Sequence, residues 1–135
     1  MRIFADTGAF YAIKAVADEN HKSAVSFQAK IKADEAIRLI TTNFVLAETY
    51  TLLKSRLGHL AAAEFGEMMR GTRTIRIIRV SEDVEEKAWH IFRKYADKGF
   101  SYIDCTSFVT MELGKINKAF AFDDHFKQYG FERVP

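Results

Sequence analysis

The chain has 135 residues, of which 48% are hydrophobic and 28% charged, and its formal net charge is +2. This composition is typical of a globular domain with a sizeable core and excludes a disordered chain. The net charge is too small to indicate a nucleic-acid partner by itself. Because Cys105 is the only cysteine, the sequence excludes a disulfide framework and a cysteine-rich zinc site.

These features predict one domain over residues 1–135 in a reducing, cytoplasmic environment. No apolar run is long enough to span a bilayer, so we expect no membrane association. The first residues lack the pattern of a signal peptide, because Arg2 is followed by only a few apolar residues before Asp6.

The first half of the chain alternates short β-type runs with helical ones. A buried strand over 2–5 leads into a helix that opens at 7–12, and helical spacing returns over 20–32. A second strand is predicted over 37–40. A helix follows over 43–57, and Asn43 is the residue expected to cap its start.

The second half continues this alternation. It is predicted to form a helix over 59–69, a strand over 74–80, a helix capped by Ser81, a helix over 103–113, and strands over 119–122 and 131–134. Alternating strands and helices of this kind predict an α/β fold, with a mostly parallel sheet and helices on both faces.

Four carboxylates stand out because each lies in an otherwise apolar stretch. They are Asp6, Glu48, Asp104 and Asp123. Burying an ionised carboxylate without a partner costs several kcal/mol or forces it to bind a proton. Four such residues, spread from one end of the chain to the other, suggest a shared cation.

The predicted elements place these acids at one rim of the sheet. Asp6 and Asp123 each follow a short strand at its carboxyl end, where open α/β sheets build their sites. Glu48 lies within a helix, and we expect its face, shared with Phe44 and Leu52, to be directed toward the core. Asp104 belongs to the start of the helix over 103–113.

Each acid except Glu48 also has a simpler structural interpretation. Asp6 is a candidate helix cap, Ser101 and Asp104 fit a capping box, and Asp123 fits a turn or a cap. Taken together, the four acids favour a metal site over four independent caps. Carboxylates without a His or Cys cluster suit Mg²⁺ or Mn²⁺, and such sites hydrolyse phosphodiesters with a metal-activated water.

The acids lie in motifs that resemble those of PIN domains. In chain order the motifs are Asp6-Thr7-Gly8, Thr42-Asn43-x-x-x-x-Glu48, Phe100-Ser101-Tyr102-Ile103-Asp104-Cys105-Thr106-Ser107-Phe108 and Phe122-Asp123-x-x-Phe126. Their order, their spacing and the chain length are most similar to the small prokaryotic VapC-type proteins, the ribonuclease toxins of toxin–antitoxin pairs. The similarity covers essentially the whole chain.

The resemblance implies a three-layer α/β/α fold with a mostly parallel central sheet of about five strands. It also implies Mg²⁺- or Mn²⁺-dependent cleavage of RNA, a homodimer and, for a toxin, a cognate antitoxin protein. All four acids are then catalytic residues and metal ligands, and Asp6 and Asp104 are the candidates for direct ligands. PIN sequences usually have Ser or Thr two residues before the fourth acid, whereas this chain has Ala121.

Neighbouring polar residues are predicted to support the acids. Thr7, Asn43 and Ser101 are expected to hold a carboxylate or a metal-bound water by hydrogen bonds, whereas Asp124 is expected to be peripheral. The four histidines show no ligand spacing and are interpreted as surface or packing residues. They are His21, His59, His90 and His125.

Two sets of alternatives stay open. The arginines at every third position from Arg70 to Arg79 either protect an edge strand or contact phosphates near the acids. The predicted function is a metal-dependent endoribonuclease, the toxin of a type II toxin–antitoxin pair. The alternatives are a PIN-fold RNA-processing nuclease outside a toxin system and a weakly active scaffold that binds RNA or protein.

Overall fold

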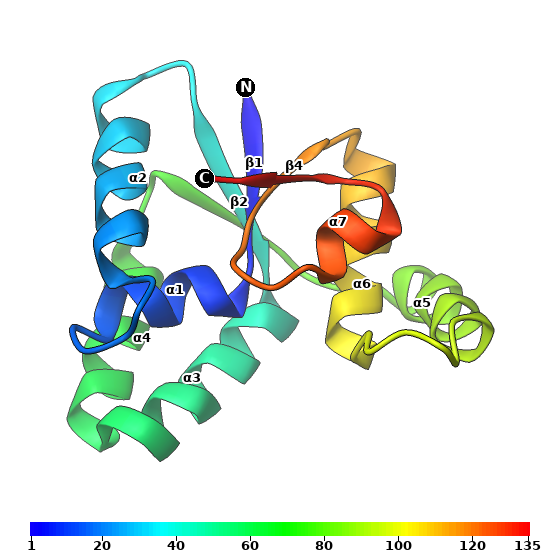
Figure 1. The fold of residues 1–135 in the computed structure, drawn as a ribbon, viewed down its shortest axis with the longest axis horizontal. Coiled ribbons are helices and arrows are strands. Elements are labelled where there is room, and N and C mark those ends of the chain that lie inside the picture. Colours follow the sequence, from blue (N-terminus) through cyan, green and yellow to red (C-terminus); the bar gives the residue numbers. More distant parts are fainter.

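The computed structural model describes residues 1–135 and contains a sheet of five parallel strands in the order β3-β2-β1-β4-β5 (Figure 1). The strands are β1 (Arg2–Ala5), β2 (Arg38–Thr42), β3 (Ile75–Ile78), β4 (Lys118–Phe120) and β5 (Glu132–Val134). The α/β fold predicted from the alternating pattern is therefore confirmed, and the sheet is wholly parallel.

Seven helices accompany the sheet. They are α1 (Thr7–Lys14), α2 (His21–Ala33), α3 (Asn43–Leu57), α4 (His59–Gly71), α5 (Glu82–Lys94), α6 (Tyr102–Gly114) and α7 (His125–Tyr129). The short helix α7 was not predicted, because five residues carry too little periodicity to distinguish a helix from a turn.

Helices cover both faces of the sheet (Figure 1). On one face, Phe27 of α2 packs on Phe120 of β4, with ring centroids 4.9 Å apart. On the other face, Phe126 of α7 packs on Phe4 of β1, with ring centroids 6.1 Å apart. Because β1 and β4 lie in the middle of the sheet and are covered on both faces, their residues form an apolar run rather than an alternating one. The predicted three-layer arrangement is confirmed.

Local signals in the sequence determine where several helices begin and end. The side chains of Thr42 and Ser81 accept hydrogen bonds from the backbone N–H groups at the starts of α3 and α5. Gly58 ends α3 with a φ of 98°, a conformation that favours glycine, and α4 then turns back along α3. Asn43, expected to cap α3, is instead the first residue of that helix.

The parallel topology brings the carboxyl ends of β1, β2 and β4 to the same edge of the sheet. Asp6 directly follows β1, and Asp123 lies in the turn between β4 and α7. α3 begins immediately after β2 and carries Glu48 near this edge. None of the helices is long and apolar enough to cross a bilayer.

Candidate active site

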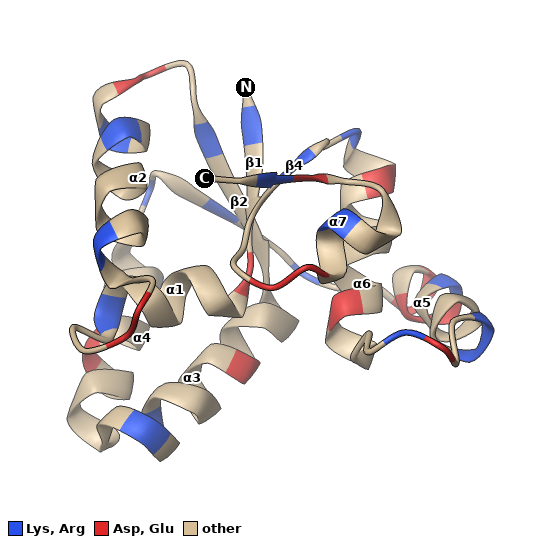
Figure 2. Ribbon diagram, viewed as in Figure 1, with Lys and Arg blue, Asp and Glu red and all other residues tan.

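A hollow of about 350 Å³ lies at the carboxyl edge of the sheet and brings the four predicted acids together. Its lining consists of Asp6, Thr7, Gly8, Glu48, Leu52, Ser101, Asp104, Asp123 and His125. We call it the acidic pocket. Figure 2 shows the contributing acidic segments on the turn after β1, on α3, at the start of α6 and on the turn before α7. Four segments distant in sequence therefore supply one site.

Asp6 is the most deeply buried of the four acids, with a residue exposure of 4%. Its carboxylate does not cap α1, and its Oδ1 atom has no hydrogen-bond partner. Burial raises the pKa of Asp6 well above its ordinary value, and the charges of Asp104, Asp123 and Glu48 raise it further. The backbone amide of Thr7 opposes this rise only in part. Asp6 is thus an unsatisfied carboxylate facing other carboxylates.

Asp104 has two roles at once. It completes a capping box, in which its backbone N–H donates to Ser101 Oγ at 2.9 Å and the Ser101 N–H donates to Asp104 Oδ2 at 3.0 Å. The same carboxylate lines the acidic pocket, and the residue is only 6% exposed. Burial raises its pKa, against the lowering effects of Ser101 and His125. The capping and site interpretations of this residue are therefore compatible.

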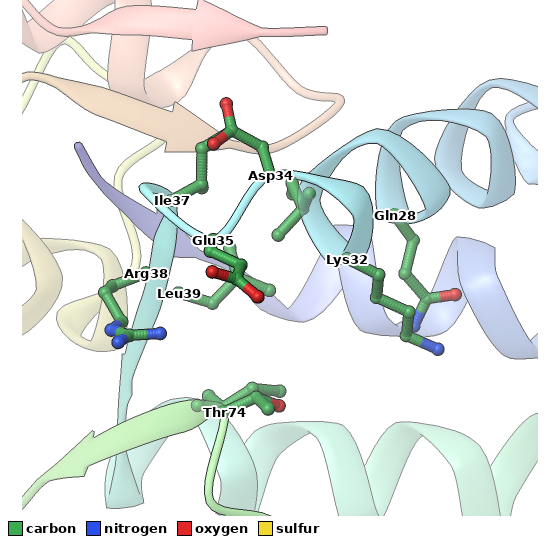
Figure 3. A pocket seen from close by; sticks show the side chains of 10 residues that line it. Gln28, Lys32, Asp34, Glu35, Ile37, Arg38, Leu39 and Thr74 are labelled. Carbon is green, nitrogen blue, oxygen red and sulfur yellow. The ribbon is translucent and has the colours of Figure 1, made fainter.

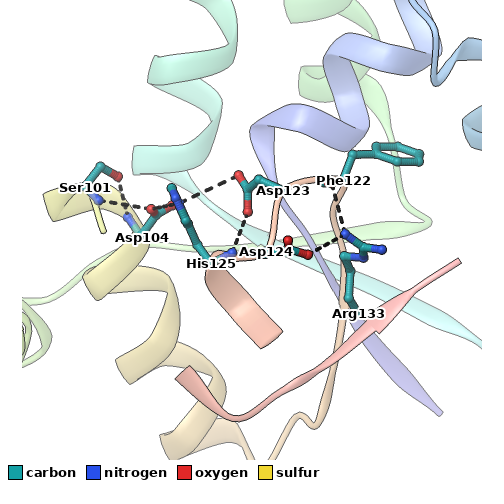
Figure 4. Close-up of polar contacts among 7 residues, drawn as sticks. All are labelled: Ser101, Asp104, Phe122, Asp123, Asp124, His125 and Arg133. Carbon is teal, nitrogen blue, oxygen red and sulfur yellow. Dashed lines mark hydrogen bonds and ion pairs between the residues drawn. The ribbon is translucent and has the colours of Figure 1, made fainter. Parts of the chain in front are cut away.

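His125 is a site residue that the sequence analysis missed, since it was interpreted as a surface or packing residue. Its Nδ1 atom lies 2.8 Å from Asp104 Oδ2 and 3.8 Å from Asp123 Oδ2 (Figure 4). Its backbone N–H donates to Asp123 Oδ1 at 3.0 Å. The ring packs edge-on against Phe100, with centroids 5.8 Å apart, and lies beside Gly99. The available signal was its position two residues after an acid, at the start of α7.

Glu48 and Asp123 form the rim of the pocket rather than its floor. The face of α3 that enters the core carries Val45, Thr49 and Leu53, all of which are fully buried. The expectation that Glu48 lies on the core-directed face is therefore wrong, because the buried face is displaced by one residue, to Thr49. The Glu48 side chain is half-buried and lines the hollow. The Asp123 side chain is 46% exposed.

Asp124 points away from this site. Its carboxylate forms an ion pair with Arg133 of β5 at 2.8 Å, and it does not line the acidic pocket (Figure 4). The Asp123 carboxylate accepts a hydrogen bond from the first residue of α7, whereas the Asp124 carboxylate pairs with β5. The two adjacent acids therefore have different partners, and only Asp123 lines the acidic pocket.

The other predicted supporting residues hold the backbone around the pocket. The Thr7 hydroxyl donates to the Val45 carbonyl at 3.3 Å, which joins the start of α1 to α3. The Asn43 side-chain oxygen accepts from the Val80 N–H at 2.7 Å, which joins α3 to the segment after β3. Neither side chain forms a hydrogen bond with one of the four acids. Ala121 is fully buried and supplies no hydroxyl.

The donor chemistry of the pocket fits a hard divalent cation, although no three His, Cys, Asp or Glu side chains are arranged to hold one ion as they stand. Asp6 Oδ1 is a buried oxygen without a partner, and the charge of Asp104 raises the pKa of Asp6. Of the two rim acids, Asp123 accepts a hydrogen bond from the His125 N–H, whereas the Glu48 side chain lines the pocket without a hydrogen bond or an ion pair. A cation would relieve both the unpaired oxygen and the repulsion.

We expect Asp6→Asn to stabilise the protein in EDTA at neutral pH. The folded-state pKa of Asp6 is raised, so ionisation penalises the folded state, and wild-type stability increases as the pH falls through that pKa toward about 3.9. Urea unfolding should give a larger free energy of unfolding for the variant at pH 7 and a smaller difference near pH 4. Asp124→Asn, which breaks an exposed ion pair, should show no such gain, and an unstabilised Asp6→Asn would contradict the electrostatic account.

Comparisons with known proteins agree with this geometry. The model of the PIN domain family matches residues 3–132. The chain is 35% identical over 132 residues to the 23S rRNA-specific endonuclease VapC20 of Mycobacterium tuberculosis, covering 98% of this chain and 97% of that protein. It is 34% identical over 127 residues to a VapC ribonuclease of Archaeoglobus fulgidus, covering 93% and 80%.

The fold of this chain also matches a solved structure of a relative. The crystal structure of M. tuberculosis VapC20, described as a Sarcin-Ricin loop cleaving toxin, superimposes with a TM-score of 0.87 at 34% identity. The match covers 96% of this chain and 95% of that one. The chain therefore belongs to the PIN-domain family and is homologous, over nearly its whole length, to VapC ribonuclease toxins.

Proposed function

We propose that this chain is a Mg²⁺- or Mn²⁺-dependent endoribonuclease of the VapC toxin type. The observation that carries the proposal is the acidic pocket, in which four acids from four segments line one hollow in a chain homologous to VapC ribonucleases. Purely structural caps would not require these carboxylates to meet, and Asp6 caps nothing.

In this proposal Asp6 and Asp104 hold the cation at the floor of the pocket, and Glu48 and Asp123 bind it from the rim. A bound divalent cation supplies Lewis-acid charge and a water of lowered pKa for attack on the phosphodiester. His125 holds the Asp104 carboxylate in a fixed rotamer, and Leu52 gives the pocket one apolar wall. No side chain in the pocket is positioned as a covalent nucleophile for this reaction.

The substrate class that we propose is structured ribosomal RNA. VapC20 is named for cleavage of 23S rRNA and its structure is described as that of a Sarcin-Ricin loop cleaving toxin. At 35% identity over nearly the whole chain, that activity is the best guide to the substrate. Ribosomal RNA would place the enzyme in the cytoplasm. A processing nuclease outside a toxin system would share the chemistry and differ in its RNA.

We expect the purified protein to cleave total RNA or 23S rRNA with Mg²⁺ or Mn²⁺, to stop cleaving in EDTA, and to leave 5′-phosphate and 3′-hydroxyl ends. Asp104→Asn should reduce kcat/KM by about 10³-fold, which is about 4 kcal/mol in the barrier. Asp124→Asn, adjacent to the site but outside it, should retain cleavage. Metal-independent cutting with 2′,3′-cyclic phosphate ends would refute the mechanism, and complete inertness would favour the scaffold alternative.

Substitution of His125 tests whether its ring positions the Asp104 carboxylate. Because His125 orients Asp104 without occupying the floor of the pocket, His125→Ala should reduce cleavage by about 10–100-fold, less than Asp104→Asn does. His125→Asn places an N–H donor near the position of Nδ1 and should restore part of the loss. Raising the Mn²⁺ concentration should rescue the alanine variant if its defect lies in metal binding. Wild-type activity in His125→Ala would contradict this role.

We propose two protein partners, a second copy of the chain and a cognate antitoxin. Support for a second copy comes from apolar side chains exposed along the α3–α4 hairpin, namely Leu57, Leu60 and Met68 at 40%, 71% and 45% exposure. Support for an antitoxin is homology to VapC20, whose structure is described as that of a toxin. Co-expression with the neighbouring small reading frame and co-purification would test the antitoxin.

We expect light scattering to give twice the mass of the chain, and we expect Leu60→Glu to shift the protein to the monomer. Leu60 is 71% exposed, so the substitution leaves the core of each copy intact. Trp89→Glu, on the exposed side of α5, is the matched control. Dissociation by Trp89→Glu alone would place the interface on α5, and a monomeric wild type at tens of micromolar would contradict the dimer.

A further inference from the structure

A second charged hollow lies at the opposite end of the strands from the acidic pocket. It has a volume of about 440 Å³ and is lined by four arginines with three uncharged residues. The arginines are Arg2, Arg38, Arg73 and Arg76, and the uncharged residues are Leu39, Ile40 and Thr74. We call it the arginine pocket. Figure 2 shows basic segments at the starts of β1 and β2, and acidic ones beyond the other end of β1.

The strand register explains why the arginines meet. Arg2 of β1 is paired with Arg38 of β2, and Ile40 of β2 is paired with Arg76 of β3. Paired residues of parallel strands point to the same face of a sheet, as do residues two apart on one strand. Three adjacent strands therefore present a guanidinium on one face. Arg73 approaches from the segment before β3.

The face concerned is the one that α6 covers. Arg2 donates to the carbonyl of Gly114, the last residue of α6, at 2.6 Å. This hydrogen bond fixes one wall of the arginine pocket to the end of the helix. The other arginine side chains are exposed and are not tied down by any hydrogen bond of their own to the protein.

No acid neutralises this cluster. None of the four arginines forms an ion pair, and no carboxylate lines the pocket. Arg38 also borders a neighbouring hollow that contains Asp34 and Glu35 (Figure 3). There the Asp34 carboxylate accepts from the Ala36 N–H, and neither acid reaches Arg38. Guanidinium groups do not lose their protons at any physiological pH, so the repulsion among them persists.

Protection of an edge strand explains only part of the cluster. β3 is an edge strand, so Arg76 and its neighbour Arg73 suit the protective role considered from the sequence. Arg2 and Arg38 belong to β1 and β2, which are paired on both sides and need no such protection. The convergence of edge and interior arginines on one hollow indicates a binding site for an anion.

We propose that the arginine pocket binds RNA phosphates remote from the cleaved bond, an inference that rests on the proposed function. All four cations are arginines, whose planar groups bind phosphate oxygens in pairs, and RNA is the polyanion that the proposed reaction requires. Asp6 lies four residues beyond Arg2 along an extended strand, about 13 Å away. An oligonucleotide of about four nucleotides centred in the acidic pocket extends only about 7 Å to either side, at about 3.4 Å per stacked nucleotide, and leaves the arginine pocket empty. A larger folded RNA reaches both pockets.

The test is cleavage kinetics of Arg38→Gln/Arg76→Gln on two substrates, a 23S rRNA fragment of about one hundred nucleotides and a short oligonucleotide of about four nucleotides around the cut site. On the long RNA, KM should rise at least tenfold with kcat retained, and the slope of log affinity against log salt should fall by about 1.5 to 2. On the short RNA, both constants should match the wild type. Lys22→Gln/Arg93→Gln, which removes two exposed cations elsewhere, is the matched control.

RNA binding and thermal unfolding distinguish a failure of the arginine-pocket proposal from a failure of the proposed cleavage. Fluorescence anisotropy of the long RNA on an Asp104→Asn background measures binding even if no cleavage is found, so the arginine pocket is tested independently of catalysis. Equal RNA affinity of the wild type and the Arg38→Gln/Arg76→Gln variant would overturn the proposal. If the double variant instead lost only its binding to poly-glutamate, the pocket would be assigned to an acidic protein segment and the proposal would also be overturned.

Thermal unfolding gives the second readout. Because the arginines repel one another, the double variant should be at least as stable as the wild type at low salt, and the difference should disappear at about 0.5 M salt. A variant that is less stable than the wild type at both salt concentrations would mean that the cluster supports the fold, and the proposal would be overturned.

Discussion

Two buried carboxylates that face one another are the constraint on which this site depends. Asp6 and Asp104 are almost entirely withdrawn from water. Burial raises the pKa of both carboxyl groups, and the charge of Asp104 raises that of Asp6 further. An apolar pair would pack more easily at the end of a parallel sheet. The fold nevertheless keeps both, because the extended residue after β1 places one carboxylate in the pocket while a capping box holds the other.

Acids gather beyond the carboxyl ends of β1 and β4 and arginines gather at the starts of β1 and β2, and the parallel topology is the reason. When all strands run the same way, residues that follow them collect at one edge and residues that start them collect at the other. Acids follow β1 and β4, and arginines start β1 and β2. A metal site for a polyanion requires cations somewhere nearby, since the acids alone repel the substrate. Separation by the length of a strand keeps the arginines from neutralising the acids.

The sequence predicted which acids line the pocket better than it predicted the residues around them. Asp6 and Asp104 were recognisable because a charged residue within an apolar run is costly to bury in any fold. Glu48 was assigned to the wrong face because its apolar neighbours Phe44 and Leu52 suggested a core face, whereas both are only partly buried. His125 contacts Asp104 across 21 residues, and no local pattern encodes that contact. The arginine cluster likewise depends on strand order and register, which periodicity does not specify.

The capping box at Asp104 determines which carboxylate oxygen of this residue is available to a ligand in the acidic pocket. Its Oδ2 atom already accepts from the Ser101 N–H and lies within hydrogen-bonding distance of His125 Nδ1. Two donors occupy the lone pairs of that oxygen, so Oδ1 alone is free to coordinate. In the proposed metal site Asp104 would therefore offer Oδ1, and an ion that also took Oδ2 would displace the contacts of that atom with the Ser101 N–H and His125.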